Sequence, residues 1–342
     1  MNTEPQNSRR TFLKLSSSLA LGAALRPFSS FARAIVPLKQ IERATFTMGS
    51  IVTIKAFCED EKRCNLAIDA AFQEMKEIDR LMSVFDNNSQ LSLVNLQSGE
   101  KEVHVDHRII EVLESARTYN DDTEGAFDVT IEPLMELYGF RDEKNDHHFP
   151  SDKEIAETLA GVGMNNVIVN DRQSTIALTN VNTRLDYGGI AVGYAIDRAV
   201  GILKSHGIES ALINHSGDIY AIGSPPEEDG WEIGITDPMR KEDIITTLRI
   251  KDKALSTSGN YQNFIQADGN TIGHILNPAN GRTASSILSG TTIAETALQA
   301  DALSTGFFVM GFDKSKTIIR QSKNLQFIAV VKDGEDETIL RI

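Results

Sequence analysis

The sequence predicts an α+β fold in which mixed or antiparallel sheets are flanked by helices. Helical and strand-like patterns are intermixed along the 342 residues, hairpin signals dominate the second half, and no internal repeat stands out. About 308 residues follow the first 34, which is enough for one large domain, residues 35–342. A polar, linker-like stretch at residues 141–153 would divide this domain if it has two lobes.

The first 34 residues have the three parts of a twin-arginine export signal. Arg9 and Arg10 precede an apolar run at residues 15–25, and small residues at 32–34 are typical of a cleavage site. The run is too short and too rich in Ser, Gly and Ala to span a bilayer. No Cys lies near the cleavage point, so we do not expect a lipid anchor there. We therefore expect a soluble protein that is exported to the periplasm.

The first half of the remaining chain predicts a hairpin followed by helices. Residues 44–57 alternate and are rich in Thr, Val and Ile, which favours strands. Apolar residues at helical spacing predict helices over 64–85 and 107–125. Residues 127–140 begin extended and then predict a short helix after a proline. Residues 151–163 have a Ser cap, early acids and a closing Gly, as a short helix does.

The second half predicts mostly strands around two helices. Strands are expected over residues 165–170, 174–180, 210–224, 231–237, 245–259, 273–278 and 289–295. The helices are expected to follow a Gly-rich turn within 184–210 and to cover 298–311. Residues 325–342 read as a closing hairpin around a Lys-Asp-Gly turn.

Charge and cysteine content narrow the function classes. The formal net charge is −14, and loss of the basic signal would make it about −18, which argues against nucleic-acid binding. A polyanionic ligand would therefore need a metal ion or a helix N-terminus to receive it. Cys58 and Cys64 are six residues apart. They could form a disulfide in an oxidising compartment, and the sequence leaves that pairing open.

A glycine turn at Gly188 and Gly189 opens the first of these two helices. It lets a ligand approach the backbone, and the helix start offers unpaired N–H groups. Asp186 precedes the turn and could accept hydrogen bonds. The glycine spacing matches neither a dinucleotide-binding fingerprint nor a Walker loop. Taken alone, such a turn is more often a tight connection than a binding site.

Other polar positions are equally ambiguous by themselves. Asp218 belongs to a Ser-Gly-Asp stretch that also suits a hairpin turn, and His274 precedes an apolar pair. Asp301 and Thr305 lie four apart, so they share one face of a mostly apolar helix. Either Asp301 caps that helix and Thr305 bonds back to a carbonyl, or both belong to a hard-cation site. The spacing alone does not decide between these readings.

Taken together, nine segments in order resemble the ApbE family of FAD:protein FMN transferases. They are TMGSIVTIKAF, IDRLMSVFDNNSQLSLVN, GAFDVTIEPLMELYGF, LDYGGIAVGYAID, ALINHSGDIYAIGS, WEIGITDP, ALSTSGNY, HILNPANGR and ADALSTGFFVMG. The resemblance covers nearly the whole region after the signal and implies an ApbE-like (T-fold-like) architecture for residues 35–342. It implies a Mg²⁺-dependent reaction in which FMN passes from FAD to a Ser or Thr hydroxyl and AMP is released.

The resemblance also implies roles for individual residues. Asp301 and Thr305 match metal ligands, and Gly189 matches the position whose carbonyl joins them. The positions that match FAD-contacting residues of the family are Met48, Phe85, Ala126, Phe127, Asp128, Asp186, His274 and Ile275. Asp186, Asp218 or a group at the metal would help the acceptor hydroxyl lose its proton. Asp301, Asp186 and Asp218 are therefore the expected catalytic residues.

Two positions depart from the usual pattern. Val192, a predicted FAD-contacting position, stands where many members have Lys or Glu, and Ser216 stands where many have Gly. Acceptor proteins of the family usually carry Asp-Gly-x-Ser/Thr-Gly-Ala-Ser/Thr, which this chain lacks, so we expect an exported partner to supply it. Two alternatives remain: an FAD pyrophosphatase, and a non-catalytic periplasmic FAD-binding protein. An aromatic residue at Phe85 favours transfer within the family.

Overall fold

The computed structural model describes residues 37–141, 149–240, 242–261, 263–267, 270–333 and 336–342. The predicted signal at residues 1–34 lies outside them, as does most of the linker-like stretch. The described residues belong to one compact unit, Pro37–Ile342. Within them, no helix is both long and apolar enough to cross a membrane.

Eight α-helices and two short 3₁₀ turns are found among the described residues. The helices are α1 Glu61–Met82, α2 Gln90–Leu96, α3 His107–Asp122, α4 Glu132–Leu137, α5 Asp152–Leu159, α6 Ala191–Ser205, α7 Ala297–Met310 and α8 Phe312–Gln321. The 3₁₀ turns are η1 Met164–Asn166 and η2 Asp171–Gln173. Side chains cap several of these helices: Asp60 accepts from the first turn of α1, and Ser151 and Glu154 form a capping box on α5.

The strands fall into four sheets within the described residues, and every pairing found is antiparallel. The largest sheet has the order β1-β2-β6-β7-β10-β13-β14-β15, and the others are β3-β5-β4, β8-β9 and β11-β12. Their bounds are β1 Lys39–Thr47, β2 Ser50–Cys58, β3 Val103–His104, β4 Val167–Asn170, β5 Thr175–Leu178, β6 Ala211–His215, β7 Asp218–Ile222, β8 Trp231–Thr236, β9 Ile244–Ile250, β10 Lys253–Ser258, β11 Phe264–Ala267, β12 Asn270–Gly273, β13 Ser289–Ala294, β14 Gln326–Asp333 and β15 Asp336–Arg341. The predicted α+β class with antiparallel sheets is confirmed.

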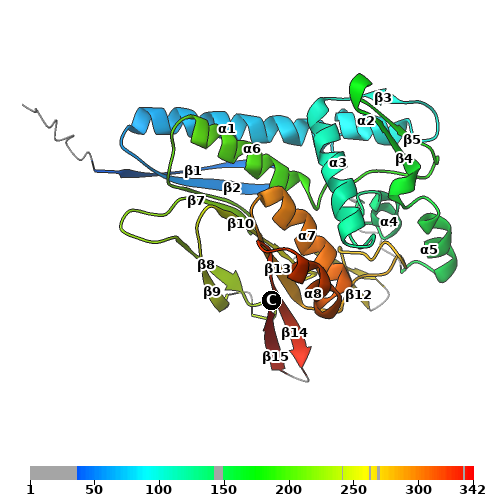
Figure 1. Ribbon diagram of the computed structural model, residues 1–342. Coiled ribbons are helices and arrows are strands. Elements are labelled where there is room, and N and C mark those ends of the chain that lie inside the picture. The colour runs from blue at the N-terminus through cyan, green and yellow to red at the C-terminus, as the bar shows by residue number, and fades with distance from the viewer. Residues whose placement is uncertain (1–36, 142–148, 241, 262, 268–269, 334–335) are drawn as a thin grey trace, which may run out of the picture. The chain divides into compact units, whose positions relative to one another are not determined.

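Different elements pack against the two faces of the large sheet (Figure 1). On one face α1, α6 and α7 pack together over alternate residues of the strands, among them Val52, Ile54 and Ala56 of β2. On the other face the β8–β9 ribbon packs through Trp231, whose ring lies 5.8 Å from that of Phe57. The sheet is therefore buried on both sides over part of its length, with the helices supplying the larger core.

Two hairpin turns lie at the same end of the large sheet. Met48 and Gly49 join β1 to β2 with φ of 51° and 77°, and Ser216 and Gly217 join β6 to β7 with φ of 53° and 108°. Positive φ at both central residues is what the tightest hairpins need, because their twist then matches that of the strands. β2 pairs directly with β6, so both turns reach the same edge of the fold.

The cysteines are paired: Cys58 at the end of β2 and Cys64 in the first turn of α1 form a disulfide. The bridge fixes the connection between the sheet and the helix that covers it. The sequence had left this pairing open.

Several parts of the fold differ from the sequence-based expectation. Residues 273–278 are not a strand beyond Gly273, because the backbone N–H of Ile275 is bonded by the side chain of Asn260 instead of by a neighbouring strand. Helices α2 and α8 were not predicted: α2 is short, and α8 follows α7 directly through Gly311, whose φ is 78°.

Candidate functional site

A hollow with a volume of about 610 Å³ lies among the described residues. It lies where the two hairpin turns, the Gly-rich turn before α6, β10 and α7 meet. All but one of the residues singled out by the sequence line it: Met48, Phe85, Ala126, Phe127, Asp128, Asp186, Gly189, Asp218, His274, Ile275, Asp301 and Thr305. Segments more than 250 residues apart in sequence therefore converge on one site.

Val192 is the exception. It lines a smaller adjoining hollow of about 150 Å³, and Met48, Phe85 and Asp186 line both hollows. Its apolar side chain thus lies beside the main site and not at its centre.

Helices α6 and α7 approach each other closely enough to bring three predicted residues together. Gly193 makes this possible, because a Cβ there would lie 2.4 Å from the carbonyl oxygen of Ala297. The backbone N–H of Gly193 donates to Oδ2 of Asp301 at 2.9 Å. A Cβ on Gly189 would lie 3.3 Å from Oγ1 of Thr305. Gly189, Asp301 and Thr305 therefore lie together on one side of the hollow.

The start of α7 is held by a carboxylate from α6. Asp197 accepts hydrogen bonds from the N–H groups of Ala297 and Leu298, at 2.7 and 2.9 Å. The N-cap itself is Thr296. Asp301 therefore does not cap this helix, and its side chain is available for another role. The reading of Asp301 as an ordinary cap is thereby excluded.

Asp301 is buried and Asp218 is half-buried, and the two carboxylates act on each other electrostatically. Burial raises the pKa of Asp218 to about 6, although a hydrogen bond from Ser256 opposes the rise. Burial and the nearby charge of Asp218 raise the pKa of Asp301 well above its usual range. Neither carboxylate is ion-paired with a Lys or Arg among the described residues. The site therefore holds concentrated negative charge that a cation would relieve.

A chain of hydroxyl groups runs from the carboxylate of Asp218 to Thr305. Ser256 donates to Asp218 at 2.5 Å, and its oxygen lies 3.1 Å from that of Ser304. Ser258 lies 2.8 Å from Ser304 and 3.2 Å from Thr305. Each hydroxyl can donate and accept, so this chain fixes the orientation of the polar wall of the hollow.

Arg141 was placed at the edge of a linker by the sequence, but it is part of the site. Its guanidinium bonds to Oδ2 of Asp186 and to Oε2 of Glu132, both at 2.5 Å. It also lies 4.9 Å from the ring centre of Phe85, a cation–π contact. Burial of the guanidinium acts to lower its pKa, but the two carboxylates outweigh this and raise it. The only signal in the sequence was a lone Arg after an aromatic pair, which is too common to single out.

Glu132 is buried with its side chain turned to Arg141. Burial raises the pKa of Glu132 to about 7, with the hydrogen bond from Arg141 opposing the rise. The second oxygen of Asp186 accepts the N–H of Gly188 at 2.7 Å. Both oxygens of Asp186 are thus already bonded.

The remaining predicted residues sit on well-anchored backbone. Oδ2 of Asp79 accepts the N–H of Met48 at 2.6 Å, which holds the first hairpin turn. Oδ1 of Asp128 accepts both the N–H and the hydroxyl of Thr130, and burial raises the pKa of Asp128. Nδ1 of His274 lies 3.0 Å from the carbonyl oxygen of Asn263. Burial lowers the pKa of His274, which favours the neutral ring.

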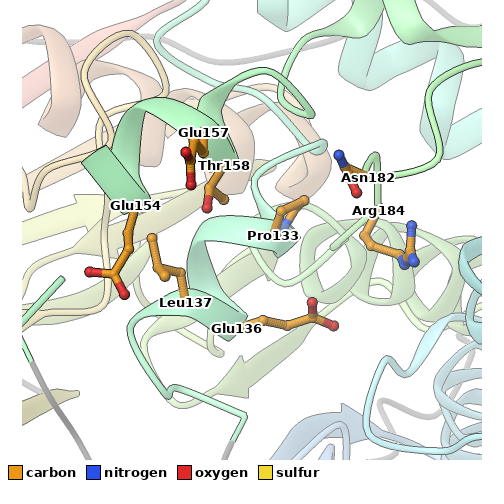
Figure 2. Close-up of a pocket in the computed structure, with 8 residues that line it drawn as sticks. All are labelled: Pro133, Glu136, Leu137, Glu154, Glu157, Thr158, Asn182 and Arg184. Carbon is orange, nitrogen blue, oxygen red and sulfur yellow. The ribbon is translucent and has the colours of Figure 1, made fainter. Parts of the chain in front are cut away.

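A separate hollow of about 520 Å³ lies between α4, α5 and the segment at 182–184, as Figure 2 shows. Glu136, Glu154, Glu157 and Arg184 lie around it, but their charged groups do not converge on one point. None of the predicted site residues lines it in the described part of the chain. The larger hollow is therefore the better candidate.

No group of three or more His, Cys, Asp or Glu side chains gathers as metal ligands among the described residues. The predicted set is of another kind, because it combines one carboxylate with a hydroxyl and a main-chain carbonyl. Its role as a cation site stays a prediction.

Known proteins are similar to this chain in both sequence and fold. A FAD:protein FMN transferase of Salmonella typhimurium is 28% identical over 293 residues, which cover 84% of this chain and 83% of the relative. One of Vibrio cholerae is 28% identical over 305 residues, covering 87% of this chain and 90% of the relative.

Solved structures of ApbE proteins are similar to this chain in fold. The ApbE protein of Thermotoga maritima has 32% identity and a TM-score of 0.80, with 89% of this chain and 97% of that chain covered. The flavin transferase ApbE of Vibrio cholerae has 26% identity, a TM-score of 0.78 and the same two shares covered. The model of the ApbE family matches residues 48–329. Since this match spans well over half of the 342 residues, the chain belongs to the ApbE family.

Proposed function

We propose that the protein is an FAD:protein FMN transferase, which moves FMN from FAD onto a Ser or Thr hydroxyl of a target protein and releases AMP. The observation that carries this proposal is the convergence of Gly189, Asp301 and Thr305 at the 610 Å³ hollow. The relatives from Salmonella and Vibrio are named for this transfer, and their alignments cover most of both chains.

The cation in this proposal is Mg²⁺, held by the Gly189 carbonyl, the Asp301 carboxylate and the Thr305 hydroxyl. Oδ2 of Asp301 accepts one N–H, and Oδ1 has no hydrogen-bond partner among the described residues. The raised pKa of Asp301 reflects buried negative charge without a basic partner. Hard oxygen ligands of this kind suit Mg²⁺, which also binds substrate phosphates. When bound, Mg²⁺ would offset charge on the pyrophosphate and on departing AMP.

Within the proposal, Asp218 and Asp186 have different roles. Asp218 has a pKa raised by burial and has one oxygen engaged, by Ser256, among the described residues. It is the better base for the acceptor hydroxyl. Asp186 has both oxygens bonded and serves to hold Arg141.

The flavin and adenine contacts are assigned within the proposal by position in the two adjoining hollows. Met48, Phe85 and Val192 lie toward one end of the site, and His274 and Ile275 belong to another wall. Ala126, Phe127 and Asp128 precede α4 and line the main hollow. FAD is long enough to need several such walls.

Export by the twin-arginine route and an exported acceptor with the Asp-Gly-x-Ser/Thr-Gly-Ala-Ser/Thr motif are also part of the proposal. The Cys58–Cys64 disulfide supports it, because such bridges persist in oxidising compartments such as the periplasm.

One assay tests the proposed function. The purified protein is incubated with FAD, Mg²⁺ and a synthetic peptide carrying the motif, and AMP release and covalent flavin fluorescence of the peptide are followed. Transfer predicts both products in equal amounts. AMP without labelled peptide would indicate a pyrophosphatase, and bound FAD with neither product would indicate a binding protein.

The Asp301→Ala variant tests the metal assignment in the same assay. Loss of an anionic ligand from a dication should weaken metal binding by more than about tenfold and abolish turnover while the fold is kept. Asp313→Ala, at an exposed position on α8, is the matched control and should retain activity. Full activity in Asp301→Ala would refute the assignment.

A further inference from the structure

A further hollow of about 430 Å³ adjoins the candidate site from the other side of the sheet. β2, the β6–β7 turn, β8 and β10 border it. We call it the sheet groove and define it by Ile51, Thr53, Gly217, Gly234, Thr236 and Thr257. Figure 1 shows β8 on the side of the large sheet away from α1 and α6, whereas β2, β6, β7 and β10 are strands of that sheet.

The sheet groove exists because the β8–β9 ribbon covers only part of this face. Along β2, Val52 and Ile54 point to the helices, so Ile51 and Thr53 point to the opposite face. Phe57, on that same face, is covered by Trp231 of the ribbon. Ile51, near the hairpin turn, is 58% exposed. The uncovered part of the face is thus the part nearest the site.

The sheet groove opens into the site. Ser50, Ser216 and Thr257 line both hollows. On β10, Ser256 and Ser258 bond to residues of the site, while Thr257 between them bonds to Thr291 at 2.9 Å. One strand therefore forms the shared wall, and a chain lying in the groove would pass within a strand's width of Asp218.

The chemistry of the groove suits an extended peptide with small side chains. No charged side chain lines it in the described part of the chain, although the whole chain has a net charge of −14. A neutral lining spares an approaching acidic residue the repulsion that the rest of the surface would exert. A Cβ at Gly217 would have nothing within 4 Å, which leaves room for a main chain to approach, and hydroxyl groups supply hydrogen-bond partners for its backbone.

We propose that the sheet groove receives the acceptor segment of the target protein and directs its hydroxyl into the site. The occupant is an extended segment with Gly and Ala next to the reactive Ser or Thr. The inference rests on the proposed transferase function, because FAD and an acceptor must then occupy adjoining spaces and meet at the pyrophosphate. With FAD in the 610 Å³ hollow, the groove gives the acceptor its own approach.

Bulky substitutions in the groove test the proposal. Thr53→Trp on β2 and Thr236→Trp on β8 should each raise the KM for the acceptor peptide at least about tenfold, while FAD affinity stays within twofold of wild type. Neither residue lines the 610 Å³ hollow. Two positions are used so that one misfolded variant does not decide the result.

Matched controls carry the same change on the same strand faces outside the groove. Lys55→Trp lies two residues beyond Thr53, and Glu232→Trp lies four before Thr236. Both form only exposed ion pairs, with Glu42 and Arg249, so their KM for the peptide should stay within twofold of wild type. Equal KM values in the groove variants, the controls and wild type would overturn the proposal.

A photoreactive peptide gives a second readout. A benzophenone at the variable position of the motif should crosslink to Ile51, Gly234 or Thr236 when FAD is present. Crosslinks confined to Phe85 or to the hollow of Figure 2 would place the acceptor elsewhere and overturn the inference. If the wild-type protein binds FAD but labels no peptide, the proposed transferase function itself fails. If the wild-type protein labels the peptide but the groove variants have the same KM as wild type, only the groove proposal fails.

Discussion

At the scale of single residues, the site has two electrostatically different ends. Asp186 is paired with the guanidinium of Arg141, so its charge is compensated within the protein. Asp218 and Asp301 have no such partner among the described residues, and burial raises the pKa of both. A cation would therefore compensate charge at only one end. This difference separates the groups proposed to hold the cation from those that shape the rest of the hollow.

Arg141 is also expected to stabilise the fold. Glu132 is only 4% exposed, and Arg141 is its hydrogen-bond partner. Arg141→Met would leave this carboxylate buried and unpaired, which should lower the free energy of unfolding by about 3–5 kcal/mol at pH 8, where Glu132 is ionised. Urea denaturation would measure the change.

The double variant Arg141→Met/Glu132→Gln should recover part of this loss, because Glu132 no longer leaves a buried charge, although Asp186 still lacks its guanidinium partner. Arg249→Met, which removes an exposed pair with Glu232, should cost less than about 1 kcal/mol. A loss in Arg141→Met no larger than in Arg249→Met would contradict the account.

At the scale of elements, the contact between α6 and α7 sets the geometry of the site. Gly193 allows the close approach, and Asp197 fixes the N-terminal end of α7. Asp301 and Thr305 then face Gly189 across the interface. The positions of these three groups therefore depend on residues that do not line the hollow.

The Gly193→Ala variant tests this contact. The added Cβ meets main-chain atoms of Ala297, which cannot rotate away, so we expect a loss of about 1–3 kcal/mol in stability and weaker Mg²⁺ binding. Gly201 lies on the same helix with open space around it, and Gly201→Ala should stabilise by about 0.5–1 kcal/mol. Thermal denaturation and calorimetric Mg²⁺ titration would show this contrast, and similar values in the two variants would argue against the close contact.

Asp197 gives a pH-dependent prediction. Burial raises its pKa to about 6 in the folded state, with the hydrogen bonds from Leu298 and Ala297 opposing the rise. The folded state then binds more protons than the unfolded state between about pH 4 and 6, so this carboxyl's contribution to stability falls as pH rises through that window.

Between pH 5 and 7, wild type should lose about 1 kcal/mol more stability than Asp197→Asn, which does not titrate. Urea midpoints at the two pH values would measure it. Asp313→Asn, at an exposed position, should follow wild type. Identical pH profiles for Asp197→Asn and wild type would show that Asp197 is not buried as described.

The sequence predicted the elements whose patterns are local and strong. Apolar spacing located α1, α3 and α7 to within a few residues, and alternation located β6 to β8. It did not predict α2, which is only seven residues long, nor the loss of strand structure after Gly273. The secondary structure of such segments depends on side-chain hydrogen bonds from residues that are distant in sequence.

For the site, the resemblance to a known family identified residues that line the hollow, because these residues lie within short sequence segments that are typical of that family. It missed Arg141 and Glu132, because their pairing depends on a fold that brings the end of α4 back to Asp186. The hydroxyl chain through Ser304 was missed for the same reason: its members come from β10 and α7, about 50 residues apart.

At the scale of the whole molecule, one large antiparallel sheet organises both proposed binding events. Helices on one face form the wall that would hold the cation, and the partly uncovered opposite face forms the sheet groove. The two meet at β10 and at the two hairpin turns. An enzyme that transfers FMN from a dinucleotide to a protein needs two such approaches to one point.

The central claim is that Gly189, Asp301 and Thr305 hold a divalent cation beside FAD. The most direct measurement is a crystal structure of the protein with FAD and Mn²⁺, in which anomalous scattering locates the metal. The account predicts a peak bounded by the Gly189 carbonyl, the Asp301 carboxylate and the Thr305 hydroxyl, next to the FAD pyrophosphate. A peak held by other residues, or FAD bound in the 610 Å³ hollow with no metal at these three groups, would contradict it.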